Sequence, residues 1–268
     1  MTTIIARAAE SVHWYRQDGK PQYTVPAKDG SDRPTTLRDA RKMDLVPSVT
    51  TILKVVSKPA LEAWKLEQML LAALTLPRIE GESEKSLIAR IAADSKEEGK
   101  KAADRGTRIH ESIEKWMKNE KDIPHQKIAM AFEEEVWDHF KTDPLQEWKV
   151  ERTFANELGF GGKVDLFCDP SESVPYGIVL DSKTKEFGPD EKVVAYEEQL
   201  MQLVAYRMGL NLPFARCANV FVSATHPGLV KVHEWPEADL KRGWEMFQNL
   251  LSYWKLKNNF GVLNADTP

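Results

Sequence analysis

Two short stretches decide the fold of this chain: GGKVD at residues 161–165 and IVLDSK at residues 178–183. Each belongs to a run of strand length and carries a carboxylate near its end. Because alternate residues of a strand share a face, Asp181 and Lys183 point to the same side of the second strand. A hairpin joining the two strands can bring Asp165 beside Asp181. The sequence therefore predicts two neighbouring carboxylates and an ammonium group on one sheet.

Hydrophobic periodicity predicts the elements around these strands. Helices are expected at residues 59–76, 84–98, 98–119, 126–141, 197–210 and 240–256. Strands are expected at residues 148–154, 161–167, 176–184, 218–224 and 229–233. This order of helices, three strands, a helix, strands and a helix predicts an α/β (α+β) fold, in which a mixed central β-sheet is flanked by helices.

The N-terminal region carries different signals. Asp18-Gly19 indicates the turn of a β-hairpin at residues 12–25. Residues 26–46 are polar and are predicted to form a long loop or mobile arm with several basic side chains. Ser48 is a candidate N-cap of a short helix.

The chain has 268 residues, enough for one large domain or two small ones. We expect a core at residues 98–268, onto which residues 1–97 pack as a hairpin, a basic arm and helices. The net charge is −4, which is not that of a generally basic nucleic-acid coat. Residues 1–58, however, hold ten Lys/Arg and six Asp/Glu, so a local anion-binding surface remains open.

Composition excludes several classes of protein. The only two cysteines, Cys168 and Cys217, cannot form a disulfide scaffold or a four-cysteine zinc or iron–sulfur site within one chain. No apolar run approaches the roughly 18 to 20 residues that a membrane span needs. Residues 1–10 lack the apolar stretch of a secretory signal. We therefore expect no membrane partner and a cytoplasmic location.

Two explanations fit the paired carboxylates. With Lys183 as their partner, Asp165 and Asp181 form a structural ion pair, which is the more common role of an Asp-x-Lys tripeptide. With Mg²⁺ or Mn²⁺ they form an oxygen-rich site of the kind that acts on phosphate esters.

His110 favours the metal site. It shares a helix face with Ile113 and Met117, and Gly106 one turn earlier leaves space beside the ring. A lone histidine on an apolar stripe is most often a satisfied core residue, and that alternative stays open. Imidazole is also a good ligand for borderline cations, which favours Mn²⁺ as well as Mg²⁺. Basic side chains crowd the same helix: Lys100, Lys101, Arg105 and Arg108.

The helix after the central strands carries a polar stripe of Gln199, Gln202 and Tyr206. This stripe is either a solvated face or a set of hydrogen-bonding groups that orient the site or a phosphate.

The order and spacing of these motifs resemble the PD-(D/E)xK nuclease superfamily. They are GTRIH ending at His110, GGKVD ending at Asp165, DSK at 181–183 and QLVAY at 202–206. Within that superfamily the sequence is most similar to the RecB-like exonucleases, a branch with mitochondrial and phage members. PSVTTIL at 47–53 also resembles a segment before the nuclease core of that branch. Each motif is weak by itself.

The resemblance implies roles for individual residues. Asp165 and Asp181 would be metal ligands, and the main-chain carbonyl of Ser182 would complete the set. His110 would be the additional ligand typical of the RecB-like branch. Lys183 would position or activate the attacking water and stabilise charge that develops on the phosphate.

The resemblance also implies a restriction-endonuclease-like core, and it includes one clear departure. Gln202 and Tyr206 match the Gln-x-x-x-Tyr signature of the branch. Some relatives hold an iron–sulfur cluster with four cysteines, and this chain cannot. Many superfamily members carry Glu where this chain has Asp181, which is an allowed alternative.

The implied activity is a DNA exonuclease that needs one or two Mg²⁺ or Mn²⁺ ions. It would hydrolyse phosphodiester bonds from DNA ends, with preference for single strands, in replication, recombination or repair in a bacterial or phage-infected cell. The helices of residues 59–119 and the arm at 28–42 would form the channel for the strand, with Trp64 and Trp116 as candidate lining. The basic candidates for DNA contact are Arg38, Arg41, Lys42, Arg105 and Arg108.

Two other functions stay open at this point. One is a structure-selective endonuclease on the same core. The other is a catalytically silent DNA-binding scaffold. This alternative is disfavoured because the set of Asp165, Asp181 and Lys183 is complete. Partners among replication or recombination proteins, the polarity of digestion and the oligomeric state are not determined by the sequence.

Overall fold

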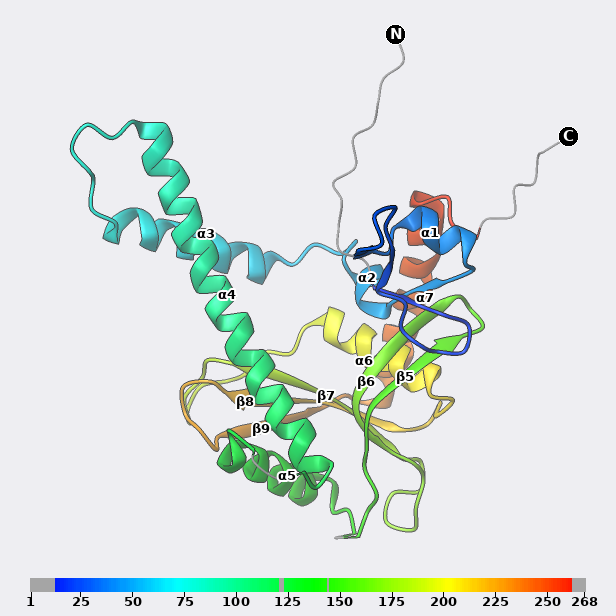
Figure 1. Ribbon diagram of the computed structural model, residues 1–268. Coiled ribbons are helices and arrows are strands. Elements are labelled where there is room, and N and C mark those ends of the chain that lie inside the picture. The colour runs from blue at the N-terminus through cyan, green and yellow to red at the C-terminus, as the bar shows by residue number, and fades with distance from the viewer. Residues whose placement is uncertain (1–12, 121–122, 144, 262–268) are drawn as a thin grey trace, which may run out of the picture.

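The computed structural model describes residues 13–120, 123–143 and 145–261 (Figure 1). At its centre is a five-stranded sheet with the order β5-β6-β7-β8-β9. The strands are β5 (Lys149–Asn156), β6 (Phe160–Cys168), β7 (Ile178–Lys185), β8 (Arg216–Ser223) and β9 (Val230–Glu234). Strands β7 and β8 pair in parallel, and the other neighbours are antiparallel. The predicted mixed sheet in an α/β fold is therefore confirmed.

Helices cover both faces of this sheet. One face carries α4 (Glu84–Met117) and α5 (Gln126–Phe140), which pack on Leu166, Leu180 and Val220. The other face carries α2 (Val49–Leu53), α6 (Glu197–Gly209) and α7 (Glu237–Lys257). Neighbouring strand residues such as Val179 and Leu180 belong to opposite hydrophobic clusters because strand side chains alternate.

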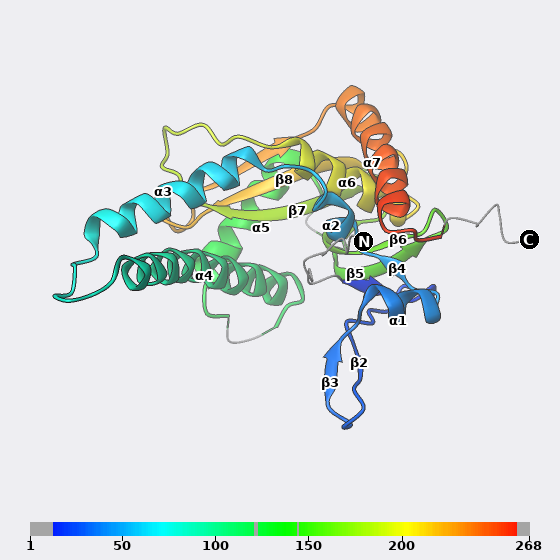
Figure 2. The ribbon, with the colours of Figure 1, turned by 90° about the horizontal axis from the view of Figure 1, so that it is seen from above.

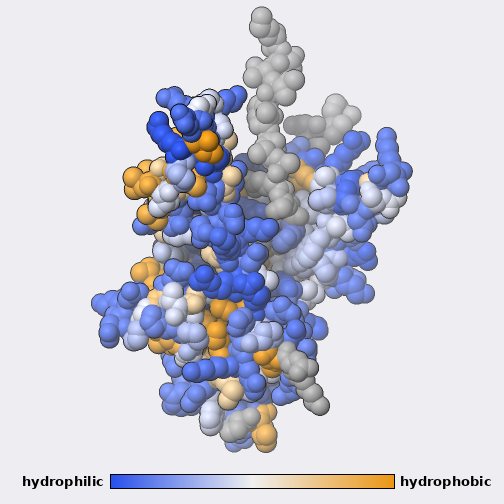
Figure 3. Space-filling view, turned by 60° about the vertical axis from the view of Figure 1, so that its left-hand side comes forward, coloured by the Kyte–Doolittle hydropathy of each residue, from blue (hydrophilic) through white to orange (hydrophobic). Residues whose placement is uncertain are grey.

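Helix α4 is one continuous helix of 34 residues, although the sequence predicts separate stretches at 84–98 and 98–119. No proline interrupts it, so the division expected between residues 97 and 98 falls inside a helix. Its first half packs against α3 (Pro59–Thr75), and the pair projects from the body of the molecule (Figure 1). Hydrophobic side chains lie among hydrophilic ones where this pair comes forward in Figure 3, and several are exposed: Leu66, Leu70, Leu74 and Ile88.

The expected hairpin at residues 12–25 is only partly correct. The turn exists, since Gly19 has φ +82° and its N–H donates to the carbonyl of Arg16. The two arms pair next to the turn, where Tyr15 forms an antiparallel bridge with Pro21 and the Gln22 N–H donates to the carbonyl of Trp14 at 2.8 Å, but the pairing goes no further. Strand β1 (Trp14–Tyr15) pairs with β4 (Val46–Pro47), and β2 (Thr24–Pro26) pairs with β3 (Asp32–Pro34). Residue 12 of the expected hairpin lies outside the described residues.

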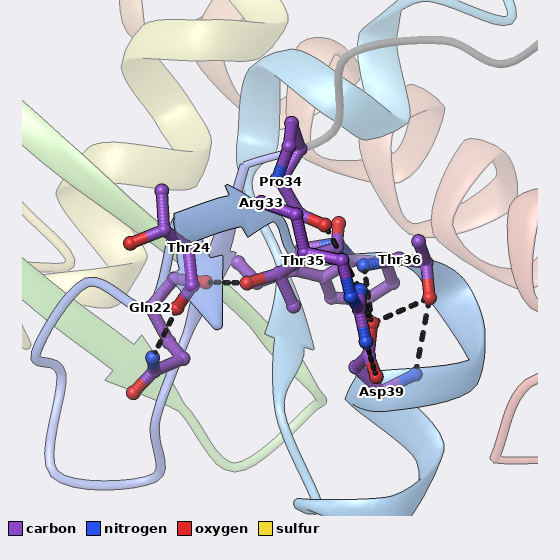
Figure 4. A network of polar contacts seen from close by, with 8 residues as sticks. Gln22, Thr24, Arg33, Pro34, Thr35, Thr36 and Asp39 are labelled. Atoms are coloured by element: carbon purple, nitrogen blue, oxygen red, sulfur yellow. Dashed lines mark hydrogen bonds and ion pairs between the residues drawn. The ribbon is translucent and has the colours of Figure 1, made fainter. Parts of the chain in front are cut away.

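The expected loop or mobile arm at residues 26–46 is wrong. It contains β3 and the helix α1 (Leu37–Lys42). Thr36 and Asp39 form a capping box at the start of α1, and the Arg33 guanidinium binds both oxygens of Asp39 at 2.6 and 2.9 Å (Figure 4). These contacts satisfy the free N–H groups of the helix start and hold the segment in place.

Residues 14–53 are part of the main core. Trp14, Leu45 and Ile52 are fully buried in the cluster that also contains the inner faces of α6 and α7. The predicted N-cap is confirmed, because the Oγ of Ser48 accepts from the Thr51 N–H at 3.0 Å. Within the described part of the chain, no helix combines the length and apolar character needed to cross a bilayer.

Candidate metal centre

The hairpin of β6 and β7 brings Asp165 and Asp181 together. Its ladder ends at the pair Leu166–Leu180, and each aspartate is the next residue on its own strand. There the N–H of Ser182 donates to Oδ2 of Asp165 at 3.0 Å, and the Ser182 hydroxyl lies 3.3 Å from the same oxygen. The predicted proximity of the two carboxylates is present. Metal ligation by the Ser182 carbonyl stays a prediction.

On the α6 face of the sheet, Asp181 is fully engaged. The Nζ of Lys183 lies 2.7 Å from Oδ1 and 2.6 Å from Oδ2, as the shared strand face predicts. Asn219, the partner of Asp181 on β8, donates its Nδ2 to Oδ2 at 2.9 Å. The Oδ1 of Asn219 accepts from the indole N–H of Trp235 at 2.8 Å. Sequence reasoning missed Asn219, although an asparagine inside an otherwise apolar strand is a recognisable signal.

The network continues into helix α6. Lys183 donates to Oε1 of Gln202 at 3.3 Å, and Nε2 of Gln202 donates to the Tyr206 hydroxyl at 2.9 Å. These two residues of the predicted stripe therefore meet the lysine. Gln199 does not join them: its Oε1 accepts from the N–H of Tyr196 at 2.9 Å, at the start of α6. Its expected role as a site-orienting group is corrected to helix capping, because its side chain turns back along the helix.

On the opposite face, His110 reaches the site from α4. Its Nε2 lies 3.0 Å from Oδ2 of Asp165. Gly106 contributes differently from the prediction: a Cβ there would lie 3.8 Å from the side chain of Thr184. This is an ordinary van der Waals distance, so a glycine is not required at this position for α4 to pack against the end of β7.

Glu151 is a further acidic residue of the site, and sequence reasoning missed it. The ladder between β5 and β6 pairs Val150 with Leu166 and Arg152 with Val164, and it is irregular between these pairs, where Glu151 faces Asp165. Glu151 has φ +56°, a left-handed conformation that costs about 1 kcal/mol or more in a residue other than glycine. Its position opposite Asp165 depends on strand register, which the sequence alone does not supply.

The two oxygens of Glu151 have different surroundings. Oε2 forms an ion pair with Lys163, and Oε1 is buried without a hydrogen-bond partner among the described residues. One ligand atom each from His110, Glu151 and Asp165 lies within 4.8 Å of the others. A buried carboxylate oxygen without a partner is costly, so this arrangement suits a cation.

The charges of the site are strongly coupled. Burial raises the pKa of Asp181 to about 6, against the favourable effect of the Lys183 ammonium and with added repulsion from Asp165. Burial also acts on Asp165, but the hydrogen bond and charge of His110 outweigh it and lower the pKa of that carboxyl. The same pair raises the pKa of His110, although burial opposes the imidazolium form.

The donor set fits Mg²⁺ or Mn²⁺. Carboxylate oxygens are the ligands that both ions prefer, and the imidazole of His110 adds a donor that suits Mn²⁺. A cavity of about 10 Å³, room for one water molecule or ion, lies beside His110, Asp165 and Ser182. The residues that would hold an ion are therefore His110, Glu151 and Asp165, whereas ligation by Asp181, whose oxygens accept from Lys183 and Asn219, stays a prediction.

The basic residues predicted to contact DNA fall into two separate places. Arg38, Arg41 and Lys42 lie on α1, and the α1 region with the β2–β3 hairpin stands well apart from α3 in both Figure 1 and Figure 2. Arg41 donates to the carbonyls of Asn258 and Asn259 at the end of α7. The expected channel built jointly by the arm and the helices is therefore wrong, because the arm packs near α7.

Arg105 and Arg108 lie on α4, within two turns of His110. Next to them is a groove of about 570 Å³ between α3, α4 and the end of β7, lined by Trp64, Lys101, Arg105, Lys185 and Tyr196 together with Glu98 and Glu186. Arg105 pairs with Glu186 at 3.1 Å. Trp116 lies elsewhere, with its indole N–H donated to Glu133 of α5 at 2.7 Å. Of the two tryptophans predicted to line a channel, only Trp64 lines this groove.

Comparisons with known proteins add little. No family model matches the sequence, and no curated protein matches it. A solved structure described as the crystal structure of SSO0001 aligns with 71% of this chain and 86% of its own, at 15% identity and a TM-score of 0.28. A TM-score this low supports no argument about fold or function.

Proposed function

We propose that this protein is a metal-dependent exonuclease that hydrolyses phosphodiester bonds from DNA ends, preferably in single strands. The observation that supports this best is the juxtaposition of Asp165, Asp181 and Lys183, with His110 on Asp165. We further propose that it acts in the cytoplasm, in DNA replication, recombination or repair, alongside proteins of those processes.

The residues of the site have distinct tasks in this reaction. When bound, a divalent cation lowers the pKa of water and neutralises the scissile phosphate. The ammonium of Lys183 stays charged, because Asp181 and Asp165 raise its pKa even though burial opposes this. Its side chain is 29% exposed, so a phosphate oxygen can approach it. Asp181 and Gln202 fix its position, and a preorganised charge of this kind stabilises the transition state more than the substrate.

The groove beside α3 and α4 is the proposed path of the DNA strand. It opens at Thr184 and Lys185, the residues that follow Lys183 on β7. Lys101, Arg105 and Lys185 supply positive charge, and Trp64 and Tyr196 supply aromatic surface. Backbone charges combined with stacking surfaces are typical of single-strand binding.

Digestion of end-labelled DNA tests the proposal. Linear single strands with Mg²⁺ or Mn²⁺ should release short labelled products, and a circular single strand of the same sequence should stay intact. Cleavage of the circle would instead identify a structure-selective endonuclease. DNA binding without cleavage of either substrate would identify a scaffold.

A further inference from the structure

We propose that Glu151 is a metal ligand and that it forms, with His110 and Asp165, a cation position that prefers Mn²⁺ to Mg²⁺. This assignment rests on the proposed function in one respect, the presence of a divalent cation at the site. It adds a residue and a metal preference that none of the sequence motifs contains.

The first support is the unpaired oxygen. The Glu151 side chain is 11% exposed, and its Oε1 has no hydrogen-bond partner in the described part of the chain. Its other oxygen already contacts Lys163, whose side chain is 46% exposed. If Glu151 served only as the partner of Lys163, a solvated pair would suffice, and no buried oxygen would be left unpaired.

The second support is the backbone. Glu151 adopts φ +56° at an irregular point of the β5–β6 ladder, between the pairs Val150–Leu166 and Arg152–Val164. Residues other than glycine held in this conformation cluster at binding and active sites. In this conformation the Glu151 carboxylate lies beside the imidazole of His110 and the carboxylate of Asp165, within one group of donor atoms.

The third support is the contrast with Asp181. Both oxygens of Asp181 accept hydrogen bonds from Lys183 or Asn219, and its side chain is 1% exposed. The donor atoms of His110, Glu151 and Asp165 instead lie within 4.8 Å of one another, on the opposite side of the sheet from Lys183. One imidazole with two carboxylates suits a borderline ion, which gives the preference for Mn²⁺.

Mn²⁺ and Mg²⁺ titrations of the full chain by calorimetry, without DNA, test this assignment. We expect Glu151→Gln to weaken Mn²⁺ binding at least about tenfold, which is the size of effect seen when groups around a bound metal are removed. The same substitution should reduce the preference for Mn²⁺ over Mg²⁺. Glu151→Gly should behave in the same way while keeping its melting temperature, because glycine accepts the left-handed conformation. Glu157→Gln, an exposed carboxylate on the following turn, is the matched control and should bind Mn²⁺ like the wild type.

Lys163→Gln separates the ligand from the ion pair. If Glu151 is a ligand, removing the competing ammonium leaves Mn²⁺ binding equal or tighter; if the ion pair is its whole role, Lys163→Gln and Glu151→Gln weaken binding alike, and the assignment is overturned. Wild-type affinity in both folded Glu151 variants also overturns it, as does a wild-type protein that binds no Mn²⁺. A wild type that binds Mn²⁺ through Glu151 yet leaves DNA intact would refute the exonuclease and keep the cation site.

Discussion

Strand β7 separates two halves of the site that differ in how their polar groups are satisfied. On the α6 side, Asp181, Lys183, Gln202 and Asn219 exchange hydrogen bonds in a continuous chain. On the α4 side, a buried oxygen of Glu151 has no hydrogen-bond partner among the described residues. A network in which every polar group has a hydrogen-bond partner is rigid and holds a charge in a fixed position. A buried polar group without such a partner is suited to a bound ion or ligand. The α6 side therefore suits transition-state stabilisation, and the α4 side suits cation binding.

The largest effect should come from the carboxylates that join the two halves. Asp165→Asn or Asp181→Asn should abolish cleavage, on the order of 1000-fold or more in rate, because several kcal/mol of transition-state stabilisation are lost. Both variants should remain folded, since the substitution removes a negative charge from a crowded site. Rates are measured on end-labelled single strands, and near-wild-type cleavage by either variant would refute the assignment.

Lys183→Ala tests the α6 half alone. It should stop turnover while Mn²⁺ and DNA still bind, because the ammonium acts when negative charge develops on the phosphate. Arginine should rescue poorly, since its planar group places charge differently from a compact ammonium. Single-turnover rates with calorimetry for metal distinguish this from a structural ion pair. Weak metal binding by the alanine variant, or retained turnover, would contradict it.

Asn219→Ala should produce an intermediate loss. It removes a donor to the buried carboxylate of Asp181 and leaves the half-buried Trp235 indole N–H without its partner. We expect a lower melting temperature and about a 10- to 100-fold lower kcat, as for groups that orient ligands. Trp235→Phe is the control, because it removes only the outer donor and should lower kcat less. Equal kcat in wild type and Asn219→Ala would show that Asp181 needs no support from β8.

The sequence predicts those parts of the site that depend on residues close together in the chain, and it fails for those that depend on pairing between strands. Strand alternation is local, so it correctly placed Asp181 beside Lys183, and helical spacing correctly placed Gln202 near Tyr206. Glu151 depends on the register between β5 and β6 and on a left-handed residue within a strand, and neither has a local signature. The prediction of a loop at residues 26–46 is wrong because the polar composition of this segment masks the capping signal of Thr36 and Asp39.

A smaller effect is expected for pH. Because the pKa of Asp181 is raised in the folded protein, its ionised form is destabilising, and the metal-free protein gains stability as pH falls through about 6. The raised pKa of His110 acts in the same direction, since its contribution is lost as pH rises through its folded value. The pKa of Asp165 is lowered, so its ionised form contributes to stability. This contribution is lost only when pH falls below the usual pKa range of an aspartate.

Mn²⁺ competes with these protons for the same groups. The increase in melting temperature that Mn²⁺ causes should therefore be largest at pH 8 and become smaller as pH falls through about 6. Scanning fluorimetry from pH 5 to 8, with and without Mn²⁺, measures both trends. Asp181→Asn should flatten the metal-free curve, and an unchanged curve would show that Asp181 does not titrate there.

The smallest effect separates the two basic regions. Arg105 and Arg108 lie on α4 near His110, whereas Arg41 is bound to the carbonyls of Asn258 and Asn259 beyond α7. If the strand follows the groove at α3 and α4, Arg105→Ala with Arg108→Ala should reduce the salt slope of single-strand binding by about 1.4, at about 0.7 per phosphate contact. Fluorescence anisotropy between 50 and 200 mM salt measures this slope.

The triple replacement of Arg38, Arg41 and Lys42 by alanine is the counterpart. It removes more charge, yet it should change the slope by less than about 0.7, because only phosphates in direct contact release counterions. It should also lower the melting temperature slightly, since Arg41 holds α1 to the end of α7. A larger slope change from the triple variant than from the α4 pair would mean that the DNA passes over α1. The groove would then lose its role as the path, although the chemistry assigned to β6, β7 and α4 would stand.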